Sequence, residues 1–250
     1  MATAPTPKPW YRILYVQVLI AVALGIAVGY LYPAFGKSLK PVGEGFVNLV
    51  KMMIAPIIFC TIVHGIASMG DLKKLGRIGG KTLLYFEVVS TFALALGLIV
   101  VNVLQPGAGF QGDAASGLTQ AHTVIAKARE LTTTQFFLGI IPTSFFSAFT
   151  SGDMLQVLLA AILTAFALSG MGERGKAVLG VIEQASQIFF RLLAIVVKAA
   201  PVGAFGAMGY TIGSFGISSL GQLAKLMLGF YLTAAVFVIV ISHLAEWAWH

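Results

Sequence analysis

A chain of 250 residues in which 58% are hydrophobic and only 10% are charged has more apolar side chains than a water-soluble fold of this size can bury, since soluble domains contain roughly 25% charged residues. The formal net charge of +7 could suggest a nucleic-acid partner, but the positive charges fall in short loops between long apolar segments, where they face anionic lipid heads. The composition therefore predicts an all-α, polytopic membrane protein that contacts the lipid bilayer and binds no nucleic acid.

The first part of the chain contains three predicted membrane spans. A polar, proline-rich tail over residues 1–12 precedes them and is expected to be cytoplasmic. In the first span, Gly25 and Gly29 form a GxxxG pair, which allows close helix approach in lipid, although glycine is also common in membrane helices generally. Each span has about the 20 residues needed to cross a bilayer, and they cover about 13–32, 43–69 and 82–104.

The second part is less regular. Residues 110–133 are polar and predict an external loop, whereas about 134–169 are apolar but interrupted by Pro142 and several hydroxyl residues. We expect two or three helical pieces there that cross the membrane once, because broken backbone at membrane depth survives only where protein or a cavity covers it. The fifth and sixth spans are predicted at about 177–199 and 223–244, separated by a glycine-rich loop from Pro201 to about Gly221.

Six crossings with both ends in the cytoplasm agree with the distribution of positive charge. Short loops rich in Lys and Arg stay on the cytoplasmic side. This topology places eight basic residues inside (Lys8, Arg12, Lys73, Lys74, Arg77, Lys81, Arg174 and Lys176) and four outside (Lys37, Lys40, Lys127 and Arg129).

Ionisable residues at membrane depth normally face protein or water. In the second span, Glu44, Asn48 and Lys51 share one helix face. Lys51 could contact an anion, but the favoured interpretation is a lysine that snorkels outward and pairs partly with Glu44. His64, on the opposite side, is interpreted as a hydrogen-bonded packing residue rather than a proton relay.

In the third span, Glu87, Ser90 and Thr91 fall at i, i+3 and i+4. A carboxylate beside two hydroxyls suits a hard cation such as sodium, or a proton, and these residues are the candidates for a cation path. The equally weighted alternative is a carboxylate near the inner membrane surface, with hydroxyls bonded back to the helix backbone.

A polar stripe on the fifth span comprises Glu183, Gln187, Arg191 and Lys198. It predicts an interface with a neighbouring helix or subunit, and the lining of a translocation path is the second interpretation. Nothing in the chain resembles a nucleophile motif, so an enzyme is not expected. Cys60 is the one cysteine, and no Cys/His cluster predicts a metal site.

The segment PVGEGFVNLVKMMIAP, residues 41–56, resembles the signature of the dicarboxylate/amino acid:cation symporter family. It has the initial proline, the Gly-acid pair, the basic residue, three aliphatic positions and the closing proline. Residues 51–109 are similar to the bacterial C4-dicarboxylate transporters of that family, and the resemblance extends over about residues 12–241.

The resemblance implies a secondary symporter that imports succinate, fumarate and malate with a proton or sodium, and uses no other cofactor. It implies an elevator motion, a homotrimer and a bacterial inner membrane location, with an inverted repeat relating the first three spans to the last three. The spans at about 13–32, 43–69, 134–169 and 177–199 would form a scaffold, and those at about 82–104 and 223–244 would belong to a moving transport domain.

Members of the family are considerably longer, and their substrate-binding residues follow the sixth helix. The resemblance therefore implies that the substrate-binding residues lie outside these 250 residues. On the third helix, the family's Thr-Ser cation pair falls on Val89 and Ser90. Only the serine hydroxyl is kept, with Thr91 beside it.

Two hypotheses of function follow from the sequence. The first is a C4-dicarboxylate:cation symporter that is incomplete and inactive alone. The second is a half-length membrane scaffold that acts by oligomerising with full-length transporters.

Overall fold

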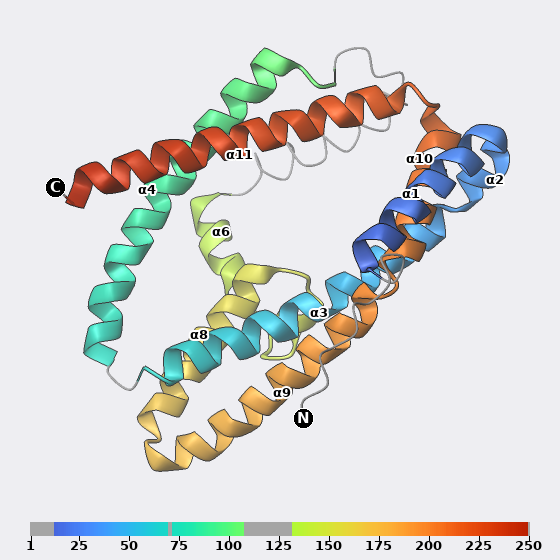
Figure 1. Ribbon diagram of the computed structural model, residues 1–250. Coiled ribbons are helices and arrows are strands. Elements are labelled where there is room, and N and C mark those ends of the chain that lie inside the picture. The colour runs from blue at the N-terminus through green and yellow to red at the C-terminus, as the bar shows by residue number, and fades with distance from the viewer. Residues whose placement is uncertain (1–12, 70–71, 108–131, 250) are drawn as a thin grey trace, which may run out of the picture. The chain divides into compact units, whose positions relative to one another are not determined.

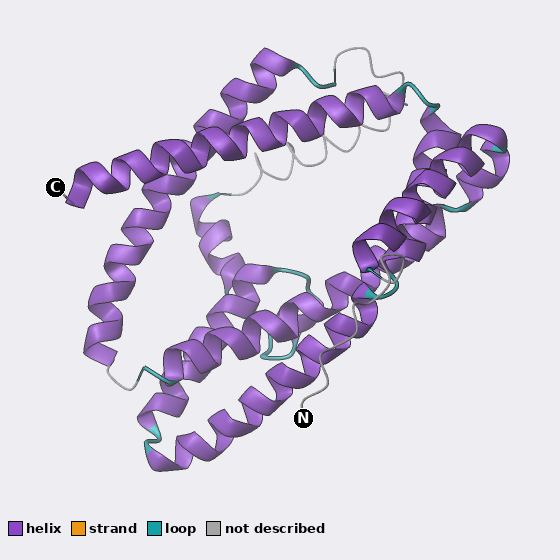
Figure 2. Cartoon of the chain, in the orientation of Figure 1, coloured by secondary structure: helices purple, strands orange, loops and turns teal. Residues whose placement is uncertain are grey.

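The computed structural model of the chain describes residues 13–69, 72–107 and 132–249 (Figure 1). All secondary structure in these ranges is helical (Figure 2). The predicted N-terminal tail and residues 110–131 of the predicted polar loop lie outside the described residues. The helices are α1 (Leu14–Leu31), α2 (Pro33–Ser38), α3 (Lys40–Ala67), α4 (Leu72–Leu104), α6 (Thr133–Ile140), α7 (Ser147–Thr150), α8 (Met154–Gly170), α9 (Glu173–Val197), α10 (Ala200–Phe215) and α11 (Ser219–Trp249).

Within the described ranges, five helical segments are long and apolar enough to cross a membrane. They match the predicted first, second, third, fifth and sixth spans and cover Leu14–Leu31, Pro33–Ala67, Gly79–Leu104, Glu173–Val197 and Ser219–Ile241. The longest helix of the predicted fourth crossing, α8, has 17 residues, fewer than the roughly 20 that a bilayer requires. The number of six crossings therefore stays a prediction.

The region of the predicted fourth span consists of three separate helices, α6, α7 and α8, as the interruptions in the sequence indicated. Thr132 and Gln135 form a capping box at the start of α6, so that two backbone N–H groups gain partners. Asp153 caps α8, where its carboxylate accepts a hydrogen bond of 2.9 Å from the backbone N–H of Leu155. Local side chains thus satisfy backbone groups that the breaks leave without helical partners.

The chain divides into two compact units, which we describe separately. Unit 1 comprises residues 1–72 and 113–214, and unit 2 comprises residues 73–112 and 215–250. The core of unit 1 lies where α8 packs against α3, with α9 alongside both. Its buried residues are Val63 from α3 and Ala161, Ala165 and Leu168 from α8. Ala161 and Ala165 are small and four residues apart, which allows the backbones of α3 and α8 to come close.

A second contact in unit 1 is built from glycines, and we call it the glycine seam: Gly25 and Gly29 of α1, Gly36 of α2, and Gly206, Gly209 and Gly213 of α10. A Cβ atom added at Gly29 would lie 2.6 Å from the carbonyl oxygen of Gly209, and one added at Gly25 would lie 2.7 Å from that of Phe205. These distances leave no room for a side chain. The pair at Gly25 and Gly29 is therefore a packing contact rather than a reflection of general glycine abundance.

The predicted glycine-rich loop after the fifth span is wrong, because residues 200–215 form helix α10. Glycine disfavours a helix by about 1 kcal/mol relative to alanine, which is why the stretch suggested a loop. Three glycines of α10, however, recur at spacings of three and four residues: Gly206, Gly209 and Gly213. They place one face of α10 against α1, α2 and the start of α3. Tertiary packing thus overrides the local preference.

Unit 2 contains most of α4 together with α11. The rings of Phe92 and Phe237 stack with their centroids 6.4 Å apart. An apolar cavity of about 220 Å³ lies between the two helices, and Leu104 and Phe230 are among the residues that line it. The described part of this unit is therefore a pair of apolar helices held by side-chain contacts.

Candidate functional site

The predicted cation-path residues Glu87, Ser90 and Thr91 all lie on α4 in unit 2, and all three are exposed. Their spacing of three and four residues puts them on one helix face. In the same stretch, Val89 and Phe92 are half-buried, and Phe92 stacks on Phe237 of α11. The structure thus brings the three oxygen-bearing side chains together on an open face of α4.

This face can supply part of a cation's coordination shell. A carboxylate and two hydroxyls offer hard oxygen ligands, but a hard cation takes about six or more. Across the described ranges, no group of three or more His, Cys, Asp or Glu residues gathers that could hold a metal ion. The three side chains would therefore need further oxygen ligands from another segment to enclose an ion.

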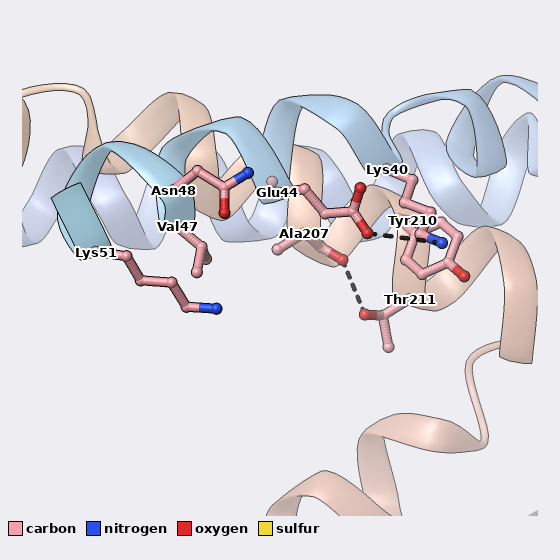
Figure 3. A pocket seen from close by; sticks show the side chains of 9 residues that line it. Lys40, Glu44, Val47, Asn48, Lys51, Ala207, Tyr210 and Thr211 are labelled. Atoms are coloured by element: carbon pink, nitrogen blue, oxygen red, sulfur yellow. Dashed lines mark hydrogen bonds and ion pairs between the residues drawn. The ribbon is translucent and has the colours of Figure 1, made fainter. Parts of the chain in front are cut away.

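A second group of polar side chains lies in unit 1, in a groove of about 420 Å³ that we call the α3–α10 groove (Figure 3). The α3 wall carries the residues that the sequence had placed on one face, Glu44, Asn48 and Lys51, together with Lys40. The α10 wall adds Tyr210 and Thr211, which sequence reasoning missed because their segment was predicted to be a loop. The glycine spacing along residues 203–213 is the signal that could have revealed a helix there.

The charges in the groove pair differently from the prediction. Nζ of Lys40 lies 3.6 Å from Oε1 of Glu44 and 5.8 Å from the ring centroid of Tyr210. The predicted partial pairing of Lys51 with Glu44 is wrong, because Lys40 is one helical turn from Glu44, whereas Lys51 is seven residues away. Seven residues correspond to about 10 Å along a helix axis. Lys51 has no ion-pair partner in the part of the chain that the structure describes.

The remaining polar predictions fall outside these two surfaces. Nδ1 of His64 is buried and lacks a hydrogen-bond partner among the described residues, so the hydrogen-bonded role predicted for it is not seen at that atom. Glu183, Gln187 and Arg191 are exposed along α9. The interface predicted for this stripe stays a prediction.

Sequence comparison places this fold among membrane transporters. Residues 14–249 match the sodium:dicarboxylate symporter family. C4-dicarboxylate transport protein 4 of Bradyrhizobium diazoefficiens is 53% identical over 235 residues, which cover 94% of this chain and 53% of that protein. C4-dicarboxylate transport protein 1 of Polaromonas naphthalenivorans is 54% identical over 238 residues, with coverage of 94% and 53%.

The C4-dicarboxylate transport protein of Cupriavidus taiwanensis is 52% identical, again over 94% of this chain and 54% of the relative. This chain thus spans about half the length of the curated relatives it matches. Its long apolar helices identify it as a multi-pass membrane protein. Every described helix lies inside the matched region. The chain therefore belongs to the sodium:dicarboxylate symporter family.

Proposed function

We propose that this chain provides the scaffold and part of the transport domain of a symporter that imports C4-dicarboxylates with a cation across a bacterial inner membrane. The observation that carries the proposal is the identity of more than half of the aligned residues to proteins named C4-dicarboxylate transport proteins. Succinate, fumarate and malate are the proposed substrates, and a proton or sodium is the proposed coupling ion. The N-terminus is proposed to be cytoplasmic and the assembly a homotrimer.

The division of the chain by contacts supports the two proposed roles. The helices expected to form the scaffold fall in unit 1, and the two expected to move, near 82–104 and 223–244, fall in unit 2. Unit 1 is also where the glycine seam and the α3–α8 core fix helices against one another. The proposal accordingly assigns the scaffold to unit 1 and the moving part to the helix pair of unit 2.

We propose that transport requires a second half of the transporter in addition to this chain. The matched relatives extend over nearly as many residues again beyond the region shared with this chain. Glu87, Ser90 and Thr91 offer only part of a cation shell, and we propose that the substrate site and the remaining ligands come from that second half. The 250 residues alone are therefore expected to take up no succinate.

A fusion protein tests the proposed function. This chain replaces the matching half of C4-dicarboxylate transport protein 4 of B. diazoefficiens, and uptake of radiolabelled succinate is measured in membrane vesicles. We expect uptake that depends on an imposed sodium or proton gradient. A fusion that is expressed and inserted to the level of the parent, yet takes up no succinate while the parent does, would contradict the proposal.

The same fusion tests the cation-path residues. Glu87→Gln removes the negative charge but keeps the shape of the side chain. An interaction with a charged group contributes about 1.5 kcal/mol or more, so its loss should raise the cation concentration for half-maximal uptake by about tenfold. Sodium and protons are titrated separately, which also identifies the coupling ion. Glu173→Gln, at an exposed carboxylate in the first turn of α9 that pairs with Lys176, is the matched control and should leave both titrations unchanged. Equal responses of the two variants would remove Glu87 from the cation path.

A further inference from the structure

The α3–α10 groove contains one lysine that forms no ion pair with the described residues. Of its three ionisable side chains on α3, Lys40 and Glu44 form an ion pair. Lys51 lines the same groove and has no ion-pair partner within the described ranges. A lysine in a membrane span that lacks a protein partner is costly unless it reaches water or an anion. The α3 side of the groove therefore carries one positive charge that is available to an anion.

The position of this charge along α3 suggests how an anion would enter. Lys40 is the first residue of α3, and Lys51 lies eleven residues further along, or about 16 Å deeper along the axis. Figure 3 shows the Lys51 side chain extending along the groove in the direction of the Lys40 end. This is the direction a snorkelling lysine takes toward the membrane surface. Its ammonium group can thus meet an anion located between the surface and the span.

The walls of the groove supply complementary groups. Asn48 lies one turn before Lys51, is exposed, and carries an amide that can donate hydrogen bonds. Oγ1 of Thr211 donates to the carbonyl oxygen of Ala207 at 2.8 Å, so it remains able only to accept. The carboxylate of Glu44, nearer the start of α3, can accept hydrogen bonds from hydroxyl groups. Between these polar groups lie apolar residues such as Val47 and Ala207.

We infer that the α3–α10 groove binds the headgroup of an anionic phospholipid with a single phosphodiester charge and a hydroxyl-bearing head, such as phosphatidylglycerol. The phosphate accepts hydrogen bonds from Lys51 and Asn48, and the glycerol hydroxyls donate to Glu44. The acyl chains continue past Lys51 into the leaflet at the Lys40 end of α3. This assignment is independent of the proposed transport function, because it needs only unit 1 and a bilayer.

Charge favours this ligand over a C4-dicarboxylate. A dicarboxylate carries two negative charges, but among the described residues Lys51 is the one lysine of the groove that is not engaged by a carboxylate, since Lys40 pairs with Glu44. A phosphodiester carries one charge, which Lys51 matches, and charge-assisted hydrogen bonds to phosphate are stronger than neutral ones. Attraction of a basic residue to anionic lipid contributes about 1 kcal/mol for each Lys near the surface.

Native mass spectrometry of the full 250-residue chain in mild detergent tests the site. The chain is titrated with dioleoylphosphatidylglycerol and, separately, with dioleoylphosphatidylcholine, which has the same acyl chains and no net charge. We expect one phosphatidylglycerol to bind more tightly than any phosphatidylcholine. Lys51→Gln should weaken that binding about fivefold, and Lys51→Arg should preserve it. Lys225→Gln, at an exposed lysine of α11 in unit 2, is the matched control and should have no effect.

Three results would overturn the inference. Equal affinities for the two lipids would show that no headgroup is recognised. An equal loss in Lys51→Gln and Lys225→Gln would reduce the effect to general charge. Displacement of the bound phosphatidylglycerol by millimolar succinate would assign the groove to dicarboxylates instead. If Lys51→Gln cannot be purified, Asn48→Leu removes the neighbouring donor and should weaken binding by a similar factor, while unchanged binding would likewise contradict the site.

Discussion

Replacing Gly29 by alanine is expected to destabilise unit 1 by about 3 kcal/mol or more, at the upper end of what overpacking costs. The new Cβ atom would lie 2.6 Å from the carbonyl oxygen of Gly209 and 3.0 Å from Cβ of Ile212. Ile212 is only 2% exposed, so neither the backbone of α10 nor this side chain can move aside without disturbing the seam. The loss is measured as a lower temperature of unfolding of the detergent-purified chain, followed by size-exclusion chromatography after heating.

Gly45→Ala is the matched control for this substitution. Gly45 lies in α3, and a Cβ atom added there meets no other heavy atom within 4 Å. Alanine has the higher helix propensity by about 1 kcal/mol, so this variant should unfold at the same temperature as the wild type or slightly above it. If Gly29→Ala were as stable as Gly45→Ala, α1 and α10 could not be in the close contact described here.

Replacing Ala165 by leucine should separate α3 from α8. Ala165 is fully buried beside Val63, Ala161 and Leu168, and three additional carbon atoms have no space in that cluster. Overpacking of this kind costs about 1–3 kcal/mol. We expect a lower unfolding temperature in detergent and a faster loss of monodisperse protein at constant temperature.

Ala167→Leu tests whether the effect of Ala165→Leu depends on position. Ala167 is exposed on the same helix, where a leucine can extend into detergent or lipid without meeting protein. The Ala167→Leu variant should therefore unfold at a temperature close to that of the wild type. Comparable losses in the two variants would show that leucine disturbs α8 wherever it is placed, and the α3–α8 core would then not be the cause.

The apolar spans could be predicted from the sequence because length and composition alone specify them. Five of the predicted spans coincide with helices of sufficient length, and Pro142 and its neighbours indicated the breaks between α6, α7 and α8. Helix α10 could not be predicted from local preference, because its glycines are explained only by the partners on α1 to α3 that they contact. A helix whose stability comes from tertiary contact gives a weak local signal.

The polar sites show the same division between local and long-range information. Helical periodicity correctly placed Glu87, Ser90 and Thr91 on one face, and Glu44, Asn48 and Lys51 on another. The pairing of charges depends on how far each side chain extends along the helix. Glu44 pairs with Lys40 rather than with Lys51. The opposite wall of the groove, with Tyr210 and Thr211, required knowledge of how α10 packs. Sequence periodicity defines a helix face, but only the fold defines what lies across from it.

Succinate uptake is compared between liposomes reconstituted with equal amounts of this chain alone and of its fusion to the second half of the B. diazoefficiens transporter. We predict that the chain alone gives no uptake above that of empty liposomes, and that the fusion gives uptake driven by a sodium or proton gradient. Gradient-driven uptake by the 250 residues alone would contradict the account, because the substrate site would then lie among the helices described here.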